Sequence, residues 1–135
     1  MSKSNATETA ILSYIFTATA PSWAAATDLD IHLHTADPGE AGISTTSEAT
    51  YTSYAAVTVT RSTSDWTVTG NTVTNDNLIQ FPQCTGGSNT ITHVSITPAG
   101  STTILYSGAL NSPLSVSNGI QPQFAAGSAL SIQED

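Results

Sequence analysis

Positive charge is almost absent from this sequence. Lys3 and Arg61 are the only lysine and arginine, against ten acidic residues, and the formal net charge at pH 7 is -8. A protein that binds nucleic acid or an anionic membrane neutralises phosphates with a basic face. No such face can be built here, so we expect neither nucleic acid nor membrane among the partners.

Cysteine and long apolar runs are also scarce. The single cysteine, Cys84, excludes an intrachain disulfide and any zinc or iron–sulfur site that needs several thiolates, and we expect it to be a small buried apolar residue. No stretch approaches the roughly 20 apolar residues that span a bilayer. The short apolar run from Ala10 to Phe16 follows Glu8 rather than a basic leader, so we do not interpret it as a secretory signal.

Hydroxyl side chains take the place of charge. Serine and threonine make up 41 of the 135 residues, whereas charged residues are only 9% of the chain, far below the quarter that is typical of soluble domains. A surface of this kind lacks the dense charge that keeps crowded monomers apart. The composition therefore favours a protein that packs against copies of itself or against another subunit.

The first 20 residues predict an arm with one short helix. Asn5 and Glu8 have the spacing of an N-cap and N3 pair, and an amphipathic helix is expected from Thr7 to Phe16, ended by Pro21. Its apolar face would comprise Ile11, Leu12, Ile15 and Phe16. This face either plugs one end of the domain or contacts another protein.

The clearest strand in the sequence is Asp28–His34, which alternates polar and apolar residues without interruption. Because side chains alternate across a strand, Leu29, Ile31 and Leu33 should face the core. The opposite face then carries Asp28, Asp30, His32 and His34. We expect this second face to be solvated or to contact a subunit.

The rest of the chain has the pattern of short antiparallel strands separated by turns. Further strands are predicted at 54–61, 66–71, 78–81, 91–97, 103–107, 114–117 and 129–133, with turns that include Gly70-Asn71 and Asn111-Ser112-Pro113. The predicted fold is all-β, a single β-sandwich of jelly-roll or Greek-key type with a short N-terminal helix. We expect one domain over residues 1–135, with the arm and helix in 1–20 and the sandwich in 21–135.

Two kinds of chemistry have weak support. Asp30, His32 and His34 lie on one face at a spacing that permits a metal site, but the remaining histidine, His93, falls on a different predicted strand, so the metal site is only an alternative. Among 41 hydroxyls, none lies in a nucleophile motif such as Gly-x-Ser-x-Gly, and we expect no enzyme, no catalytic residue and no cofactor.

Aromatic residues offer a possible platform for sugar rings. The candidates are Trp23, Trp66, Tyr51, Tyr54 and Tyr106. Trp66 precedes the alternating Val68, which favours core burial, whereas Trp23 lies between Pro21 and an alanine run and suits an interface.

An ordered set of short motifs resembles a family of small structural proteins of tailed bacteriophages, described as head-decoration, capsid-fibre or tail-fibre-like. The most specific is the run Leu33–Gly42, LHTADPGEAG. An apolar helix precedes it; the motifs that follow are a tyrosine-containing strand at 54–59, Trp66, the IQFP element at 79–82, THVSI at 92–96 and ILYSGAL at 104–110. The resemblance covers most of the chain and implies no catalytic residues.

What the resemblance implies is a non-enzymatic virion protein made in the host bacterial cytoplasm. Its most direct interpretation is a capsid decoration protein on the capsid surface that bridges major capsid protein subunits, with a homotrimer expected by analogy. The alternative is a tail-fibre or adhesin-type module that binds host surface glycans. For either, the expected partner contacts are Ile11, Leu12, Ile15, Phe16, Trp23, Asp37, Pro38, Gly39, Glu40 and Gly42.

Overall fold

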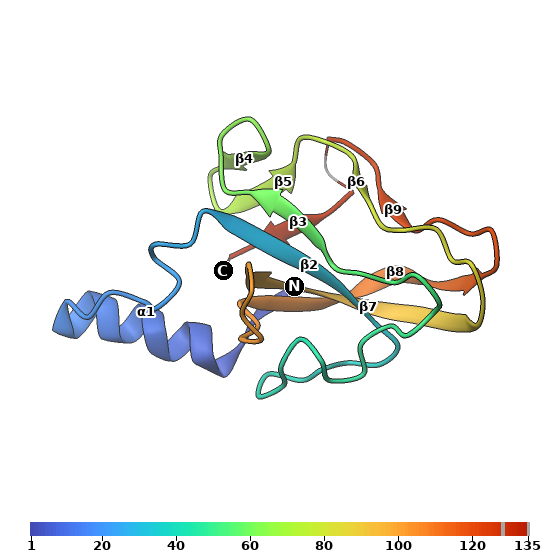
Figure 1. Ribbon diagram of the computed structural model, residues 1–135. Helices are drawn as coiled ribbons and strands as arrows, with labels where there is room; N and C mark the ends of the chain where they lie inside the picture. Colours follow the sequence, from blue (N-terminus) through green and yellow to red (C-terminus); the bar gives the residue numbers. More distant parts are fainter. Residues whose placement is uncertain (128, 135) are drawn as a thin grey trace.

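A computed structural model describes residues 1–127 and 129–134, so residues 128 and 135 of the predicted sandwich lie outside the described residues. The predicted all-β fold with one N-terminal helix is confirmed (Figure 1). The elements are β1 (Ser2–Lys3), α1 (Asn5–Thr17), β2 (Asp28–His34), β3 (Val57–Thr60), β4 (Trp66–Thr69), β5 (Thr72–Asn75), β6 (Ile79–Gln80), β7 (Ser88–Pro98), β8 (Tyr106–Ser117), β9 (Gln123–Phe124) and β10 (Ser131–Gln133).

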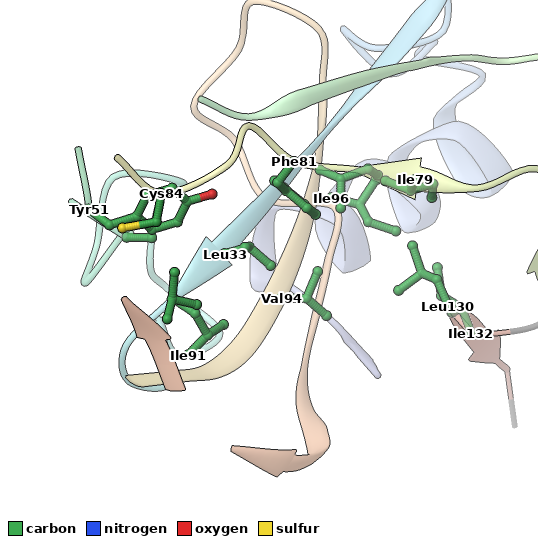
Figure 2. Close-up of a cluster of buried hydrophobic side chains, with 13 residues drawn as sticks. Leu33, Tyr51, Ile79, Phe81, Cys84, Ile91, Val94, Ile96, Leu130 and Ile132 are labelled. Atoms are coloured by element: carbon green, nitrogen blue, oxygen red, sulfur yellow. The ribbon is translucent and has the colours of Figure 1, made fainter. Parts of the chain in front are cut away.

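The strands form two layers around one core. A five-stranded antiparallel sheet has the order β1-β8-β7-β2-β3, and two smaller sheets, β10-β5-β4 and β6-β9, form the second layer. Figure 2 shows side chains of both layers meeting between them. The buried cluster comprises Ile31, Leu33, Ala49, Tyr51, Ile79, Phe81, Cys84, Ile91, Val94, Ile96, Val116, Leu130 and Ile132.

Alternation along β2 and β7 decides which side chains enter this core. Ile31 pairs with Ile96 and Leu33 pairs with Val94, and all four side chains are buried in the cluster. The prediction that the apolar residues of β2 face the core is confirmed. The other face of the same two strands carries polar pairs, of which His32 with Ser95 is one.

The turn predicted at Asn111-Ser112-Pro113 is wrong. These residues lie within β8, which pairs with β7 along most of its length. The register steps from the pair Ala109–His93 to the pair Leu114–Ile91, so residues 110–113 form a bulge opposite one short stretch of β7. A bulge accommodates proline because its residues are not needed as ladder donors. The sequence showed the proline but not that the strand resumes after it.

Two other boundaries also differ from the prediction. The helix begins at Asn5, two residues earlier than expected, because the N-cap is Ser4 rather than Asn5. The Ser4 Oγ accepts a hydrogen bond from the Thr7 amide at 3.2 Å. The helix ends at Thr17, before Pro21, where Ala18 adopts a left-handed conformation with φ of 55°. The Gly70-Asn71 turn is confirmed as the connection between β4 and β5.

The two ends of the described chain meet at the edge of the large sheet. Lys3 in β1 pairs with Tyr106 in β8, and the Glu134 carboxylate forms an ion pair with Lys3 and accepts a hydrogen bond from the Tyr106 hydroxyl. These two donors hold the pKa of Glu134 below its usual value, whereas burial first and then the Glu134 contact raise the pKa of Tyr106. Within residues 1–127 and 129–134, no helix is long and apolar enough to cross a membrane.

Candidate functional site

The most unusual feature of the molecule is that α1 projects from the sandwich with apolar side chains exposed (Figure 1). Thr7 is the only buried residue of the helix. The exposed fractions are 57% for Leu12, 64% for Ile15 and 79% for Phe16. Tyr14, on another side of the helix, is 58% exposed, so the predicted amphipathic pattern is wrong. The last turns are apolar around most of the circumference, and the helix does not plug the sandwich.

The first turn of α1, by contrast, is held firmly. The Ser4 amide donates to the Leu105 carbonyl at 3.1 Å, and the Ser4 hydroxyl donates to the Ile104 carbonyl. The Asn5 amide donates to the Glu40 carbonyl at 3.0 Å. The helix is therefore fixed at its base and uncovered at its far end.

The loop that supplies Glu40 is the predicted contact loop, residues 37–42. The Asp37 carboxylate accepts a hydrogen bond from the Gly39 amide at 2.8 Å, and Gly39 has a φ of +73°, which favours glycine. Pro38 is buried, while Asp37 and Glu40 are exposed. A Cβ at Gly42 would lie 1.9 Å from the Pro38 carbonyl oxygen, so only glycine fits. The loop is a tight turn that supports the base of α1, and its role in partner contacts stays a prediction.

An apolar pocket of about 410 Å³ lies between the base of α1 and the end of the sandwich. We call it the end pocket. It is lined by Thr7, Ile11, Trp23, Leu29, Arg61, Ser62, Thr63, Trp66, Val68, Val73, Ile96, Leu105, Tyr106 and Ile132. Of the predicted contact residues, Ile11 and Trp23 are therefore in this pocket, whereas Leu12, Ile15 and Phe16 lie beyond it on the helix.

Two polar contacts shape the end pocket. The Arg61 guanidinium donates to the Trp23 carbonyl at 2.9 Å and to the Ala26 carbonyl, which fixes the chain around Trp23. The Trp66 indole donates to the Thr60 carbonyl at 3.1 Å, and Trp66 is half-buried. Trp66, which we expected in the core, packs against the core but is only partly buried. The alternation at Val68 on which that expectation rested does not hold, because Val68 is 72% exposed at the pocket.

The histidine face of β2 is not the open surface that we predicted. His32 and His34 are buried, and their rings contact Thr46 and Glu48 of the long polar loop after β2. This loop runs beside β2 beyond the end of β3, where the Ala49 amide donates to the Leu33 carbonyl at 2.8 Å. This backbone pairing comes from the long polar loop after β2. Sequence alternation could not reveal it, since alternation does not say what covers a face.

Each histidine joins this loop to strand β7. His34 Nδ1 lies 2.8 Å from the Thr46 carbonyl, and its Nε2 lies 2.7 Å from the Ser95 hydroxyl. A carbonyl only accepts, so Nδ1 carries the proton and Nε2 accepts from Ser95. Burial lowers the pKa of His34, which keeps the ring neutral in this role.

His32 repeats the arrangement one step along the strand. Its Nδ1 lies 2.7 Å from the Glu48 carboxylate and its Nε2 lies 3.2 Å from the Thr97 hydroxyl. The Tyr54 hydroxyl also donates to Glu48, at 3.1 Å. The chain of hydroxyl, imidazole and carboxylate has the order found in hydrolases, but Thr97 is fully buried and His32 nearly so. The geometry describes a structural network that fastens the loop.

Asp30, the third residue of the alternative metal site, is engaged elsewhere. Its carboxylate accepts from the Thr58 hydroxyl at 2.6 Å and from the Gly100 amide at 2.9 Å. All the ring nitrogens of His32 and His34 have protein partners as well. Among the residues that the structure describes, no group of three or more histidine, cysteine, aspartate or glutamate side chains is arranged to hold a metal ion.

The tyrosines proposed as a sugar platform are mostly internal. Tyr51 is 3% exposed and meets Tyr54 edge to face, and Tyr54 stacks on Phe81 with ring centroids 6.5 Å apart. Cys84 is confirmed as a buried residue, 1% exposed. Of the aromatic candidates, Trp23, Trp66 and Tyr106 are the ones that line the end pocket.

Comparison with known protein families gives one match over nearly the whole chain. The family described as Podophage GP4 fiber I protein gp80 matches residues 2–132. This chain belongs to that family. No curated protein matches it closely enough to add a relative.

Membership of the fiber I protein family confirms the coarser part of the sequence resemblance. The chain is a structural protein of a bacteriophage virion, and its location is virion-associated. Sequence reasoning missed Arg61, Val68 and Val73 as parts of the end pocket, and Tyr14 as an exposed side chain of α1. The only signal for them was that Val68 lies in an alternating strand, which is equally typical of a core position.

Proposed function

We propose that this protein is a non-enzymatic subunit of a virion fibre, and that the far end of α1 attaches it to another virion subunit. The observation that carries the proposal is the exposure of Leu12, Ile15 and Phe16 on a helix whose base is firmly held. A helix that is apolar all round is normally buried. In a virion protein, another subunit is the natural cover.

The energetics favour several contacts acting together. Full burial of a leucine, isoleucine or phenylalanine side chain contributes about 1.5–3 kcal/mol, so covering the exposed parts of these three contributes roughly 3–6 kcal/mol. Association of two proteins costs about 4–15 kcal/mol in lost freedom of motion. One helix alone therefore gives a weak contact, and a stable fibre needs this contact repeated among many subunits.

The description of the matching family favours a fibre over a capsid decoration protein. Decoration of the capsid surface, with bridging of major capsid protein subunits, is the second candidate, supported by the resemblance of the run Leu33–Gly42. The two candidates share the projecting helix and differ in place and copy number. Host glycan binding has less support, because the end pocket is lined mainly by apolar side chains, whereas a sugar needs many hydrogen-bonding groups.

A reconstruction of purified virions, together with quantitation of this chain relative to the major capsid protein, tests the proposal. We expect density for the sandwich in a fibre, at a copy number well below that of the major capsid protein. Density distributed over the capsid at a copy number near that of the major capsid protein would instead establish the decoration role. Absence of the chain from purified particles would refute both.

A complementation experiment tests the helix. Phage lacking this chain is supplied with the triple variant Leu12→Ser, Ile15→Ser, Phe16→Ser, and particles are assayed for the protein. We expect the variant to be folded and soluble but lost from particles. The matched control is Leu114→Ser, which changes an exposed leucine on β8. Incorporation of the helix variant at the level of this control would contradict the proposed attachment.

A further inference from the structure

We propose that the occupant of the end pocket is the far end of α1 from a second copy of this chain. Leu12, Ile15 and Phe16 of one copy would enter the pocket of the next, beside its Trp23, Trp66 and Val68. This contact names the subunit that covers the helix in the proposed function. Its biological setting rests on that proposed function. The contact itself is derived from the pocket and the helix.

The first argument is the character of the pocket. The pocket opens to solvent, and its volume of about 410 Å³ is within the range of roughly 300–1,000 Å³ that is typical of binding pockets. Its walls include the two tryptophans of the chain together with Leu29, Val73 and Ile132. Apolar walls bind apolar side chains, and the largest exposed apolar side chains of this protein are on α1.

The second argument is that the far end of α1 does not reach the end pocket of its own chain. Thr7 and Ile11 line the pocket from below, and the helix rises about 1.5 Å per residue, so Phe16 lies roughly 7–8 Å further along the axis than Ile11. The base cannot swing, because Ser4 and Asn5 are hydrogen-bonded to Leu105, Ile104 and Glu40. The exposed end is therefore available to a neighbouring molecule.

The third argument is electrostatic. The last turn of α1 contains no basic residue, and the C-terminal end of a helix carries a partial negative charge. Arg61, one of only two basic side chains in the chain other than histidine, lines the end pocket. Insertion of the helix end would bring this guanidinium to the negative end. The only charged residue on α1 is Glu8, in the first turn, so docking the far end buries no charge of the helix.

Because the helix and the pocket are different surfaces, the contact is head to tail. Such contacts form a ring if the rotation between copies closes and an open filament if it does not. Each copy then offers one helix and one pocket, and every contact in the assembly is the same. Either arrangement has a mass above that of the monomer.

Sedimentation and light scattering of the purified chain test this directly. At about 100 μM we expect a mass that is a multiple of the monomer, set by mass action. Phe16→Asp removes the inserted side chain and Val68→Asp changes the pocket, and each should weaken association at least about tenfold. The matched control is Ile120→Asp, which changes an exposed isoleucine after the end of β8 that does not line the end pocket. A monomeric wild-type chain at this concentration would overturn the proposal.

Mixing the two variants makes the test sharper. The Phe16→Asp chain keeps an intact pocket, and the Val68→Asp chain keeps an intact helix, so an equimolar mixture should form a one-to-one pair that neither variant forms alone. Absence of that pair when wild type associates would show that another surface is responsible. Equally, if both variants lose stability without a change in mass, the helix packs within its own chain and the proposal is wrong.

The outcomes separate this inference from the proposed function. If the purified chain associates through α1 but is absent from virions, the fibre role fails and the contact stands. If the chain is present in fibres but is monomeric and unaffected by Phe16→Asp, the fibre role stands and the contact fails.

Discussion

Replacing Ser95 by alanine should measure what the buried histidine face contributes to the fold. The Ser95 hydroxyl lies 2.7 Å from His34 Nε2, and both side chains have no exposed surface. The Thr46 carbonyl takes the proton of Nδ1, which leaves Nε2 as an acceptor whose donor is Ser95. In Ser95→Ala this acceptor has no partner and no access to water.

Leaving one buried polar atom unpaired costs about 1–3 kcal/mol. A domain of this size has a total stability of roughly 5–15 kcal/mol, so the loss is large enough to measure by urea denaturation. Fluorescence of Trp66, which is half-buried, reports unfolding. The matched control is Ser88→Ala on the same strand, where the serine is exposed and the change should stay within about 0.5 kcal/mol.

A double variant isolates the interaction itself. His34→Phe with Ser95→Ala replaces both partners by apolar groups, which should recover part of the loss, so the two changes should couple by at least about 0.5 kcal/mol. The reasoning is refuted if Ser95→Ala costs no more than Ser88→Ala. It is also refuted if the two changes on β2 and β7 are additive, since residues that share a hydrogen bond must couple.

Three further outcomes are expected. Burial holds the pKa of His34 below its ordinary 6.5, so as the pH falls the unfolded chain binds a proton before the folded chain does. The free energy of unfolding should therefore be highest above about pH 6.5 and fall below that pH by at most about 1.4 kcal/mol per pH unit. His34→Asn should remove this decline in urea denaturation measured at several pH values. Phe81→Ala, at a site 1% exposed, should cost about 3–5 kcal/mol in the same assay, and a cost near that of a surface change would contradict the core assignment. Gly42→Ala should cost about 1–3 kcal/mol because its Cβ would overlap the Pro38 carbonyl oxygen, whereas the exposed neighbour Ala41→Ser should be nearly neutral.

For the predicted strand Asp28–His34, polar–apolar alternation identified the core face but not what covers the opposite face. Alternation correctly assigned Ile31 and Leu33 to the core, because the strand geometry places every second side chain on one face. It said nothing of what lies against His32 and His34. Their cover comes from residues 46–49 of a polar loop, and the Ser95 and Thr97 hydroxyls come from a strand about 60 residues later.

For α1, the sequence predicted the helix but not its position relative to the sandwich. The apolar spacing of Ile11, Leu12, Ile15 and Phe16 correctly predicted a helix, but it left open whether this face plugs the domain or contacts another protein. Burial depends on the direction in which the helix leaves the sheet. That direction is set by the hydrogen bonds of Ser4 and Asn5 to distant loops, which no local pattern contains.

The fold class, the turn at Gly70-Asn71, the core face of β2 and the burial of Cys84 could be predicted from the residues alone, because they follow from local geometry and from the preference of apolar residues for the interior. The sequence also shows that Arg61 is one of only two lysine or arginine residues, but only the fold places it at the end pocket. Only the folded structure shows that α1 projects, that the histidine face is covered and that Val68 is exposed. These outcomes depend on which distant segments come together, and that is a property of the whole packing rather than of any one stretch of chain.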